Sequence, residues 1–250
     1  LGMNRLAGLL QQPKKYLRDI ISKDLPVSIV TFDKIIAEAK LNLNVEEIKI
    51  KLKGSTHSYP AFLKIDKNFW RLVGLWVAEG DLNGYTVRIH NSNPEIRNDA
   101  ENICRQYGFF ISKSETCFSI NSLFLQKVFQ QVLSLGTGAK HKRIPPLVFI
   151  LDKESKAHFL RGYFSGDGSI YPAERGKFKI EAGTVSKELA NDLLYLLLDF
   201  GIVASVYTKP ERTGSITHRI SILGVKNFEA FREAGFIDAA RNSCIEKYIL

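Results

Sequence analysis

The chain has 250 residues, 45% hydrophobic and 24% charged, which is typical of a folded protein with a sizeable core. Its net charge of +9 favours a polyanionic partner, and no apolar run is long enough to cross a membrane. The three cysteines, Cys104, Cys117 and Cys244, lack the spacing of a metal site and are odd in number. We therefore expect a reducing, intracellular setting in the cytoplasm or nucleoid, not secretion.

Residues 1–65 predict a small N-terminal region that is mostly helical. We expect three short helices: 5–11, 13–22 and 31–39. Pro13 suits a helix start, and short helices with tight connections are typical of a helix-turn-helix unit. The second helix carries basic side chains that suit contacts with DNA phosphates: Lys14, Lys15, Arg18 and Lys23. A helical extension with a solvated basic face is the alternative interpretation.

Two similar helix-like segments dominate the rest of the chain. Residues 72–80 end in Glu79-Gly80, and residues 160–168 end in Asp167-Gly168. Each segment has small residues four positions apart, on the face where two helices can approach closely: Gly74 and Ala78, then Gly162 and Gly166. Each acid falls at a helix C-terminus, where the helix dipole disfavours negative charge. Two carboxylates in such places are costly unless a cation joins them, so the pattern predicts a metal-dependent site at a two-fold axis.

The same order of predicted elements follows each segment. In the first copy we expect a turn, a strand, a helix, a hairpin and a helix: 81–84, 85–90, 94–107, 110–120 and 123–133. In the second copy we expect a strand, a helix, a hairpin and a helix: 177–182, 187–200, 203–223 and 227–233. The prediction is an α+β protein with two pseudo-symmetric αββαββα repeats, residues 66–150 and 151–250, whose antiparallel sheets form a saddle.

The two acids suggest the chemistry of the site. If the motif helices pack side by side, Glu79 and Asp167 would lie close together, and the carbonyls of Ala78 and Gly166 could add ligands. Such oxygen donors suit Mg²⁺, which keeps several waters; Mn²⁺ or Ca²⁺ could replace it in binding. A metal of this kind neutralises a scissile phosphate and lowers the pKa of an attacking water. Phosphodiester hydrolysis is the reaction class that fits.

The strands suggest the substrate, since a saddle of two sheets can follow the major groove of duplex DNA. The candidate DNA-contacting residues lie on the polar face of the strands, or in the second hairpin's turn: Thr86, Arg88, His90, Lys177, Lys179, Glu181, Arg212, Thr217, Arg219 and Ser221. Arg, Lys and His side chains can donate hydrogen bonds to acceptor atoms of purine bases, and a Glu carboxylate can accept one from the cytosine amino group. Any half-buried strand alternates in this way, so only the whole set points to DNA.

Both motifs, the strand order and the segment Ile144-Pro145-Pro146 resemble the LAGLIDADG homing endonucleases over residues 67–249. Two motifs in one chain are similar to the monomeric form of that family, which is encoded in inteins or introns. The resemblance implies a mixed α/β fold and Mg²⁺-dependent cleavage of both strands of a long duplex DNA site. It places Glu79 and Asp167 at the metal-binding positions.

The resemblance also implies a basic residue beside the acids, from Lys140 or Lys142 in the segment between the repeats. In the second repeat Arg241 is the closest match, so the two strand-cutting sites should be unequal. Asn93 and Ser186, with Arg241, fall where polar residues organise water. A non-cleaving DNA-binding regulator and an RNA maturase are the alternatives, because relatives that do not cut would look similar.

Overall fold

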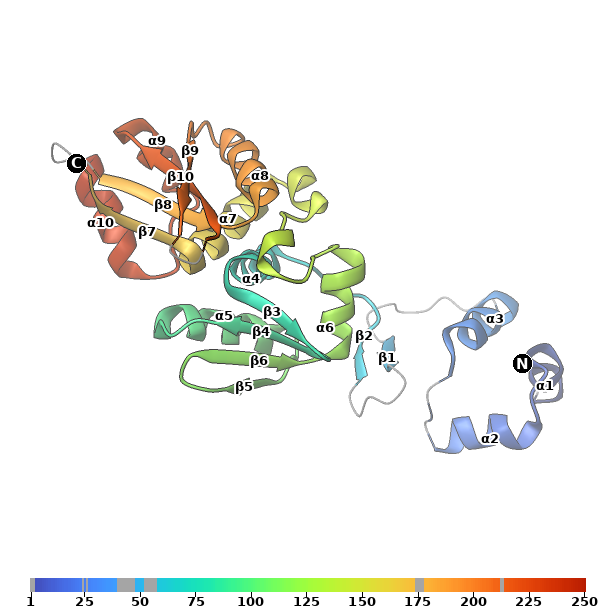
Figure 1. Cartoon of the computed structure of the whole chain (residues 1–250). Helices are drawn as coiled ribbons and strands as arrows, with labels where there is room; N and C mark the ends of the chain where they lie inside the picture. The colour runs from blue at the N-terminus through green and yellow to red at the C-terminus, as the bar shows by residue number, and fades with distance from the viewer. Residues whose placement is uncertain are drawn as a thin grey trace. The chain divides into compact units, whose positions relative to one another are not determined.

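The computed structural model describes residues 3–23, 25, 27–39, 48–51, 58–173, 178–211 and 214–250 (Figure 1). The chain divides into two compact units, Leu1–Leu63 and Lys64–Leu250. In the described part of the chain, no helix combines the length and the apolar character that a membrane span needs.

The described residues of the first unit form three helices and a small sheet. The helices are α1 (Met3–Leu10), α2 (Lys14–Ser22) and α3 (Ile29–Ala39), and strands β1 (Lys49–Lys51) and β2 (Ser58–Pro60) pair antiparallel. Pro13 precedes α2 in an extended conformation. Proline is tolerated there because the N–H that it lacks would have no partner within the helix. The three predicted N-terminal helices are confirmed.

The second unit begins with the first repeat. Its elements are α4 (Lys67–Glu79), β3 (Gly80–Asn83), β4 (Thr86–His90), α5 (Pro94–Gln106), β5 (Ile111–Lys113), β6 (Cys117–Asn121) and α6 (Leu123–Lys127). A π-helical turn, Val128–Val132, continues α6. The sheet has the antiparallel order β3-β4-β6-β5. The turn expected at 81–84 is wrong: these residues mostly form β3, because Gly84, with φ of +58°, makes the turn later.

The second repeat has the same plan. Its elements are α7 (Lys153–Asp167), β7 (Gly168–Pro172), β8 (Phe178–Thr184), α8 (Lys187–Leu198), β9 (Ser205–Pro210), β10 (Ile216–Leu223) and α9 (Val225–Phe231). The sheet order is β7-β8-β10-β9, which matches the first sheet strand for strand. The predicted α+β class with two αββαββα repeats is confirmed. A further helix that was not predicted, α10 (Ala239–Ile249), follows α9.

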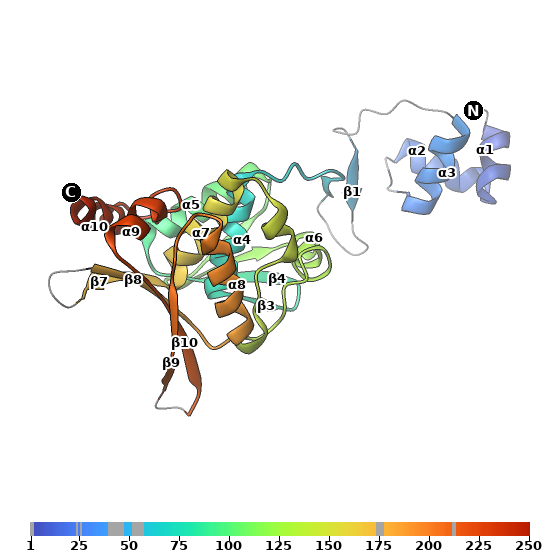
Figure 2. The same ribbon diagram turned by 90° about the horizontal axis from the view of Figure 1, so that it is seen from above.

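Helices α4 and α7 lie side by side at the centre of the second unit (Figures 1 and 2). A Cβ atom added to Gly74 would overlap the Phe159 carbonyl oxygen, and one added to Gly162 would lie 2.8 Å from the Leu75 nitrogen. Real Cβ atoms do not approach other atoms so closely. The two glycines therefore let the main chains touch, as their spacing predicted.

We expect Gly162→Ala to destabilise the second unit by about 1–3 kcal/mol, because the new methyl group would force the two helices apart. Both tryptophans, Trp70 and Trp76, lie in α4, so denaturant unfolding followed by tryptophan fluorescence reports on this contact. Gly8→Ala is the control, since a Cβ at Gly8 meets nothing within 4 Å. An unchanged free energy of unfolding in Gly162→Ala would contradict the close packing.

Candidate active site

The two central helices end side by side at Glu79 and Asp167. An added Cβ at Gly166 would lie 2.6 Å from the Ala78 Cβ and 3.2 Å from the Glu79 Cγ, so the acidic ends are in contact. Gly80 and Gly168 then lead each chain directly into a strand, and any side chain there would overlap the helix that precedes it. Both carboxylates thus lie at the negative end of a helix dipole, near enough for their charges to repel each other.

Burial is the main influence on both acids. It raises the pKa of Glu79 to about 7; the hydrogen bond that Asn91 Nδ2 donates to Glu79 Oε2 over 2.9 Å opposes this rise, and repulsion from Asp167 adds to it. Burial likewise raises the pKa of Asp167 to about 6, against the influence of Lys142 and Tyr163. Both carboxylates are therefore poorly compensated by the protein itself.

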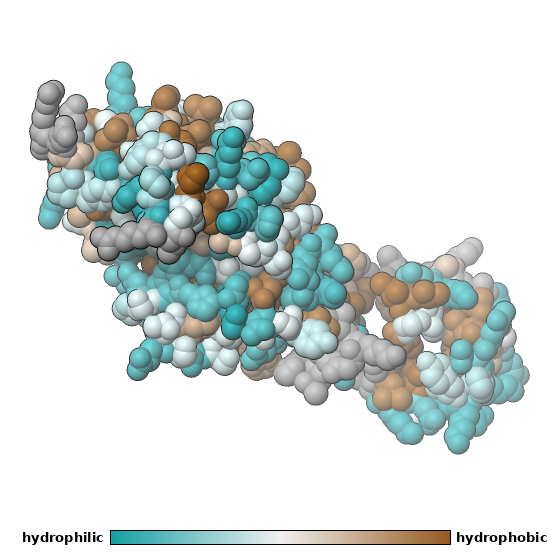
Figure 3. Space-filling view, viewed as in Figure 1, coloured by the Kyte–Doolittle hydropathy of each residue, from teal (hydrophilic) through white to brown (hydrophobic). Residues whose placement is uncertain are grey.

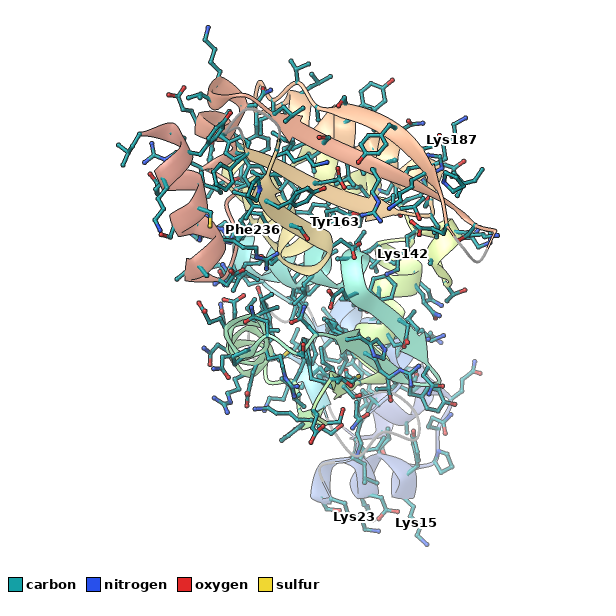
Figure 4. The ribbon with its side chains drawn as sticks, turned by 60° about the vertical axis from the view of Figure 1, so that its left-hand side comes forward. Lys15, Lys23, Lys142, Tyr163, Lys187 and Phe236 are labelled. Carbon is teal, nitrogen blue, oxygen red and sulfur yellow. The ribbon has the colours of Figure 1, made fainter. Side chains whose placement is uncertain are left out.

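Lys142 is the basic residue that reaches these acids. Its Nζ donates to the Ala78 carbonyl oxygen over 2.8 Å and lies 5.7 Å from the centre of the Trp76 ring. Burial lowers the pKa of Lys142, and attraction to Asp167 and Glu79 opposes this effect. Lys140 is instead exposed on the short turn Ala139–His141. Figure 4 shows Lys142 and Tyr163 in the region between the two sheets.

Arg241 takes the comparable place at the end of α7. Its guanidinium donates to the main-chain oxygens of Gly168 at 2.6 Å, Ser165 at 2.8 Å and Phe164 at 3.2 Å. Its Nε donates to Asp238 over 2.6 Å. Arg241 thus satisfies the last carbonyls of the helix and has few donors left for water. The two halves are therefore unequal around their acids.

Asn93 and Ser186, which we expected to organise water, are helix caps. Asn93 Oδ1 accepts from the Glu95 nitrogen at 2.9 Å, and Ser186 Oγ accepts from the Leu189 nitrogen at 3.1 Å. Ser186 is buried and also donates to the Lys142 carbonyl oxygen over 2.7 Å. The sequence interpretation missed Asn91, the residue that contacts Glu79. Its position directly after β4 was the available signal, because the β3–β4 hairpin returns the chain to the end of α4.

On the first sheet, the candidate DNA-contacting side chains lie opposite the buried Val87 and Ile89. Asp81 on the neighbouring strand accepts from Arg88 at 2.6 Å and lies 3.0 Å from the His90 ring. Thr86 donates to Asn121 over 3.0 Å. An open depression beside Glu79 is lined by His90, Asn91, Ser92 and Thr116, so solvent reaches this acid from the sheet's side.

On the second sheet, Glu181 is 6% exposed and is used within the protein. It accepts from Lys179 at 2.8 Å and from the Tyr207 hydroxyl at 2.6 Å, and an Arg219 nitrogen lies 3.7 Å away. Thr217 and Ser221 are buried. Lys177 and Arg212 lie outside the described residues. In Figure 3 the visible face of this unit carries mainly hydrophilic residues.

In the first unit, the basic side chains expected to meet phosphates are exposed on α2: Lys14, Lys15 and Arg18. Leu17, on the same helix, is 3% exposed, so α2 is held to the first unit by this buried side chain. Figure 4 labels Lys15 on this helix.

The donors at the acidic ends fit a hard divalent cation. In the part of the chain that the structure describes, no three His, Cys, Asp or Glu side chains are placed so that they could hold one metal ion, which argues against a tetrahedral zinc site there. Two carboxylates with main-chain oxygens nearby suit Mg²⁺, which takes its other ligands from water. The buried Tyr163 hydroxyl faces Asp167 and lowers its pKa, yet no described group bonds it in good geometry.

Residues 154–234 match the LAGLIDADG-like domain family. The uncharacterized protein MJ1054 of Methanocaldococcus jannaschii is 37% identical over 172 residues, 62% of this chain and 19% of that protein. A DNA polymerase of Thermococcus aggregans is 30% identical over 149 residues, 56% of this chain and 8% of the polymerase. The chain therefore spans only a small part of either relative. The full-length DUF199/WhiA structure from Thermatoga maritima has a TM-score of 0.53 and 16% identity over 73% of this chain and 59% of that one, which shows a shared fold.

We expect Asp167→Asn to be more stable than the wild type above pH 7 when EDTA is present. A raised carboxyl pKa means that the folded state binds the proton more tightly than the unfolded state, so stability falls as the pH rises from about 4 to about 6. The variant lacks this loss, which amounts to about 1–3 kcal/mol. The difference should vanish near pH 4, and Mg²⁺ at pH 8 should raise the thermal midpoint of the wild type only. Identical pH profiles would contradict the buried, uncompensated carboxylate.

Proposed function

This chain belongs to the LAGLIDADG family, and from that premise we propose that it is a metal-dependent endonuclease that cuts both strands of duplex DNA at one long target site. The observation that carries the proposal is that α4 and α7 pack closely where they end in Glu79 and Asp167, whose charges repel each other beside Lys142 in a protein of net charge +9. A purely structural helix pair has no need for two uncompensated acids at this place.

Glu79 and Asp167 would hold the divalent cation, with Mg²⁺ as the natural ion and Mn²⁺ or Ca²⁺ as substitutes in binding. When bound, the cation neutralises the scissile phosphate and lowers the pKa of water. Asn91 orients Glu79 and favours its ionised form, because it donates a hydrogen bond to the carboxylate. Lys142 brings a positive charge to the acids, where it can stabilise the charge that develops on the phosphate. Arg241 is tied to main-chain oxygens, so the two strands should be cut at unequal rates.

The sheets and the first unit would bind the DNA as a monomer. Asp81 fixes Arg88 and His90, and Glu181 fixes Lys179, so these donors are held in defined positions that suit base recognition. In this proposal Glu181 supports the contacting side chains from behind, because it is buried and bonded to Lys179 and Tyr207. The exposed basic face of α2 suits phosphates.

A segment similar to this chain forms a small fraction of a much longer DNA polymerase. An element inserted in a host gene would produce this pattern, since the element's activity is separate from the polymerase reaction. This supports the proposal that the endonuclease is encoded within an intein or intron.

Incubation of the full chain with a randomised duplex DNA library should give breaks at one long motif with Mg²⁺ and none with EDTA. We expect Asp167→Asn to abolish cleavage of both strands and to change Kd by less than about tenfold, because it alters charge at the metal but not the DNA-binding sheets. Glu154→Gln, at the exposed start of the same helix, is the control and should cut normally.

Enrichment of a bound motif without breaks in the wild type would instead identify a DNA-binding regulator. Tighter binding to structured RNA than to any duplex DNA would identify an RNA maturase. Full cutting by Asp167→Asn would overturn the assigned site.

Replacement of Lys14, Lys15 and Arg18 by alanine should weaken binding to the recovered target. It should also make the negative slope of log association constant against log salt concentration shallower by about 2–3, because each phosphate contact contributes about 0.9 to the steepness of that slope. The control is Lys34→Ala, since Lys34 is an exposed basic residue of α3 and is not among the expected phosphate contacts. An unchanged slope in the triple variant would assign α2 to a role other than DNA contact.

A further inference from the structure

The segment that carries Lys142 is held by helix α8 of the second repeat. Ser186, the cap of α8, donates to the Lys142 carbonyl oxygen over 2.7 Å. Asp192 accepts from the Ile144 nitrogen at 3.2 Å and from Arg143 at 2.8 and 3.1 Å. The main chain is therefore fixed on both sides of Arg143. Figure 4 shows Lys142 on this connecting segment and Lys187 at the start of α8.

Asp192 is an unusual residue for its position. It is 6% exposed on the face of α8 that also buries Leu189, Leu193 and Leu196. A carboxylate in such surroundings is costly unless charged and hydrogen-bonded groups compensate it. Here a guanidinium and a main-chain N–H compensate it, and both come from the segment next to Lys142. The cost of burial is thus offset only while the segment stays in place.

The first repeat provides an internal comparison, because Asn93 and Ser186 are equivalent caps and Asp99 and Asp192 each follow six residues later. Asp99 binds Arg71 of α4, with two contacts of 2.7 Å, within its own half. It does not hold the connecting segment. The fold of the repeat therefore does not require an aspartate at this position to bind the connecting segment. Asp192 makes these bonds only in the repeat that packs against the segment carrying Lys142.

We propose that Asp192 is a positioning residue for Lys142: it fixes residues 143–144 so that the amine reaches the end of α4 beside the two acids. The role of Lys142 in cleavage rests on the proposed function, whereas its placement does not. The second repeat thus assembles part of the site at the acidic end of the first repeat's helix.

The placement is tested by labelling the full chain with an amine-reactive reagent and measuring Lys142 by mass spectrometry relative to Lys140, which is exposed two residues away. We expect Asp192→Asn to raise the ratio by about tenfold, because the lost charged hydrogen bonds release the segment. Asp199→Asn is the control, since Asp199 follows the same helix but pairs with Lys156. Arg143→Ala, whose side chain is largely exposed, removes the other partner and should also raise the ratio even if Asp192→Asn fails to fold.

Cleavage of the recovered target then tests the mechanism separately. Introduced alone, Asp192→Asn should lower kcat by about tenfold. Added to Lys142→Met, the same substitution should cause no further loss, because Asp192 acts through the Lys142 amine. A labelling ratio that stays at the wild-type value in both Asp192→Asn and Arg143→Ala would overturn the positioning role. Equal losses in the presence and absence of Lys142 would overturn it as well. A wild-type protein that cuts no DNA would refute the proposed function but leave the labelling result to decide the placement.

Discussion

The contact between α4 and α7 is the constraint on which the rest of the second unit depends. The main chains can touch only because Gly74 and Gly162 lack a Cβ, and this closeness fixes where the helices end. Their ends carry Glu79 and Asp167, and the next glycines turn the chain at once into β3 and β7. One steric condition therefore places both acids and both sheets. A slightly wider helix pair would separate the carboxylates and tilt the sheets that start from them.

That closeness has an electrostatic consequence. Burial raises the pKa of both carboxylates and lowers the pKa of Lys142, so each charged form is disfavoured by its surroundings. The protein compensates these charges only in part, through Asn91, Lys142 and Arg241 at Glu79 and through Lys142 and Tyr163 at Asp167. Such a site gains most when a divalent cation enters, since one ion relieves both acids. The same arrangement that weakens the unliganded fold therefore favours the proposed chemistry.

The repeats share their strand order, yet their details differ where chemistry is expected. Lys142 reaches the end of α4 with its amine, whereas Arg241 uses its guanidinium to cap α7. Asp99 binds within its own half, whereas Asp192 binds the segment between the halves. Duplicated folds can keep their packing while such side chains change, because the packing depends on the glycines and the apolar core.

The sequence by itself determined the repeat, the close helix pair and the two acids, because apolar periodicity, small residues four apart and acid-glycine endings are local signals. It also predicted most helices and strands, but not α10, and it placed a turn where β3 forms. Only the tertiary structure showed that Lys142 lies beside the acids and Lys140 is exposed, revealed the contacts of Asn91 and Asp192, and showed Asn93 and Ser186 as caps. Those roles depend on contacts between residues far apart in the chain, and on which side of a fold a loop lies. Spacing along the sequence cannot encode such contacts, whereas packing in three dimensions fixes them.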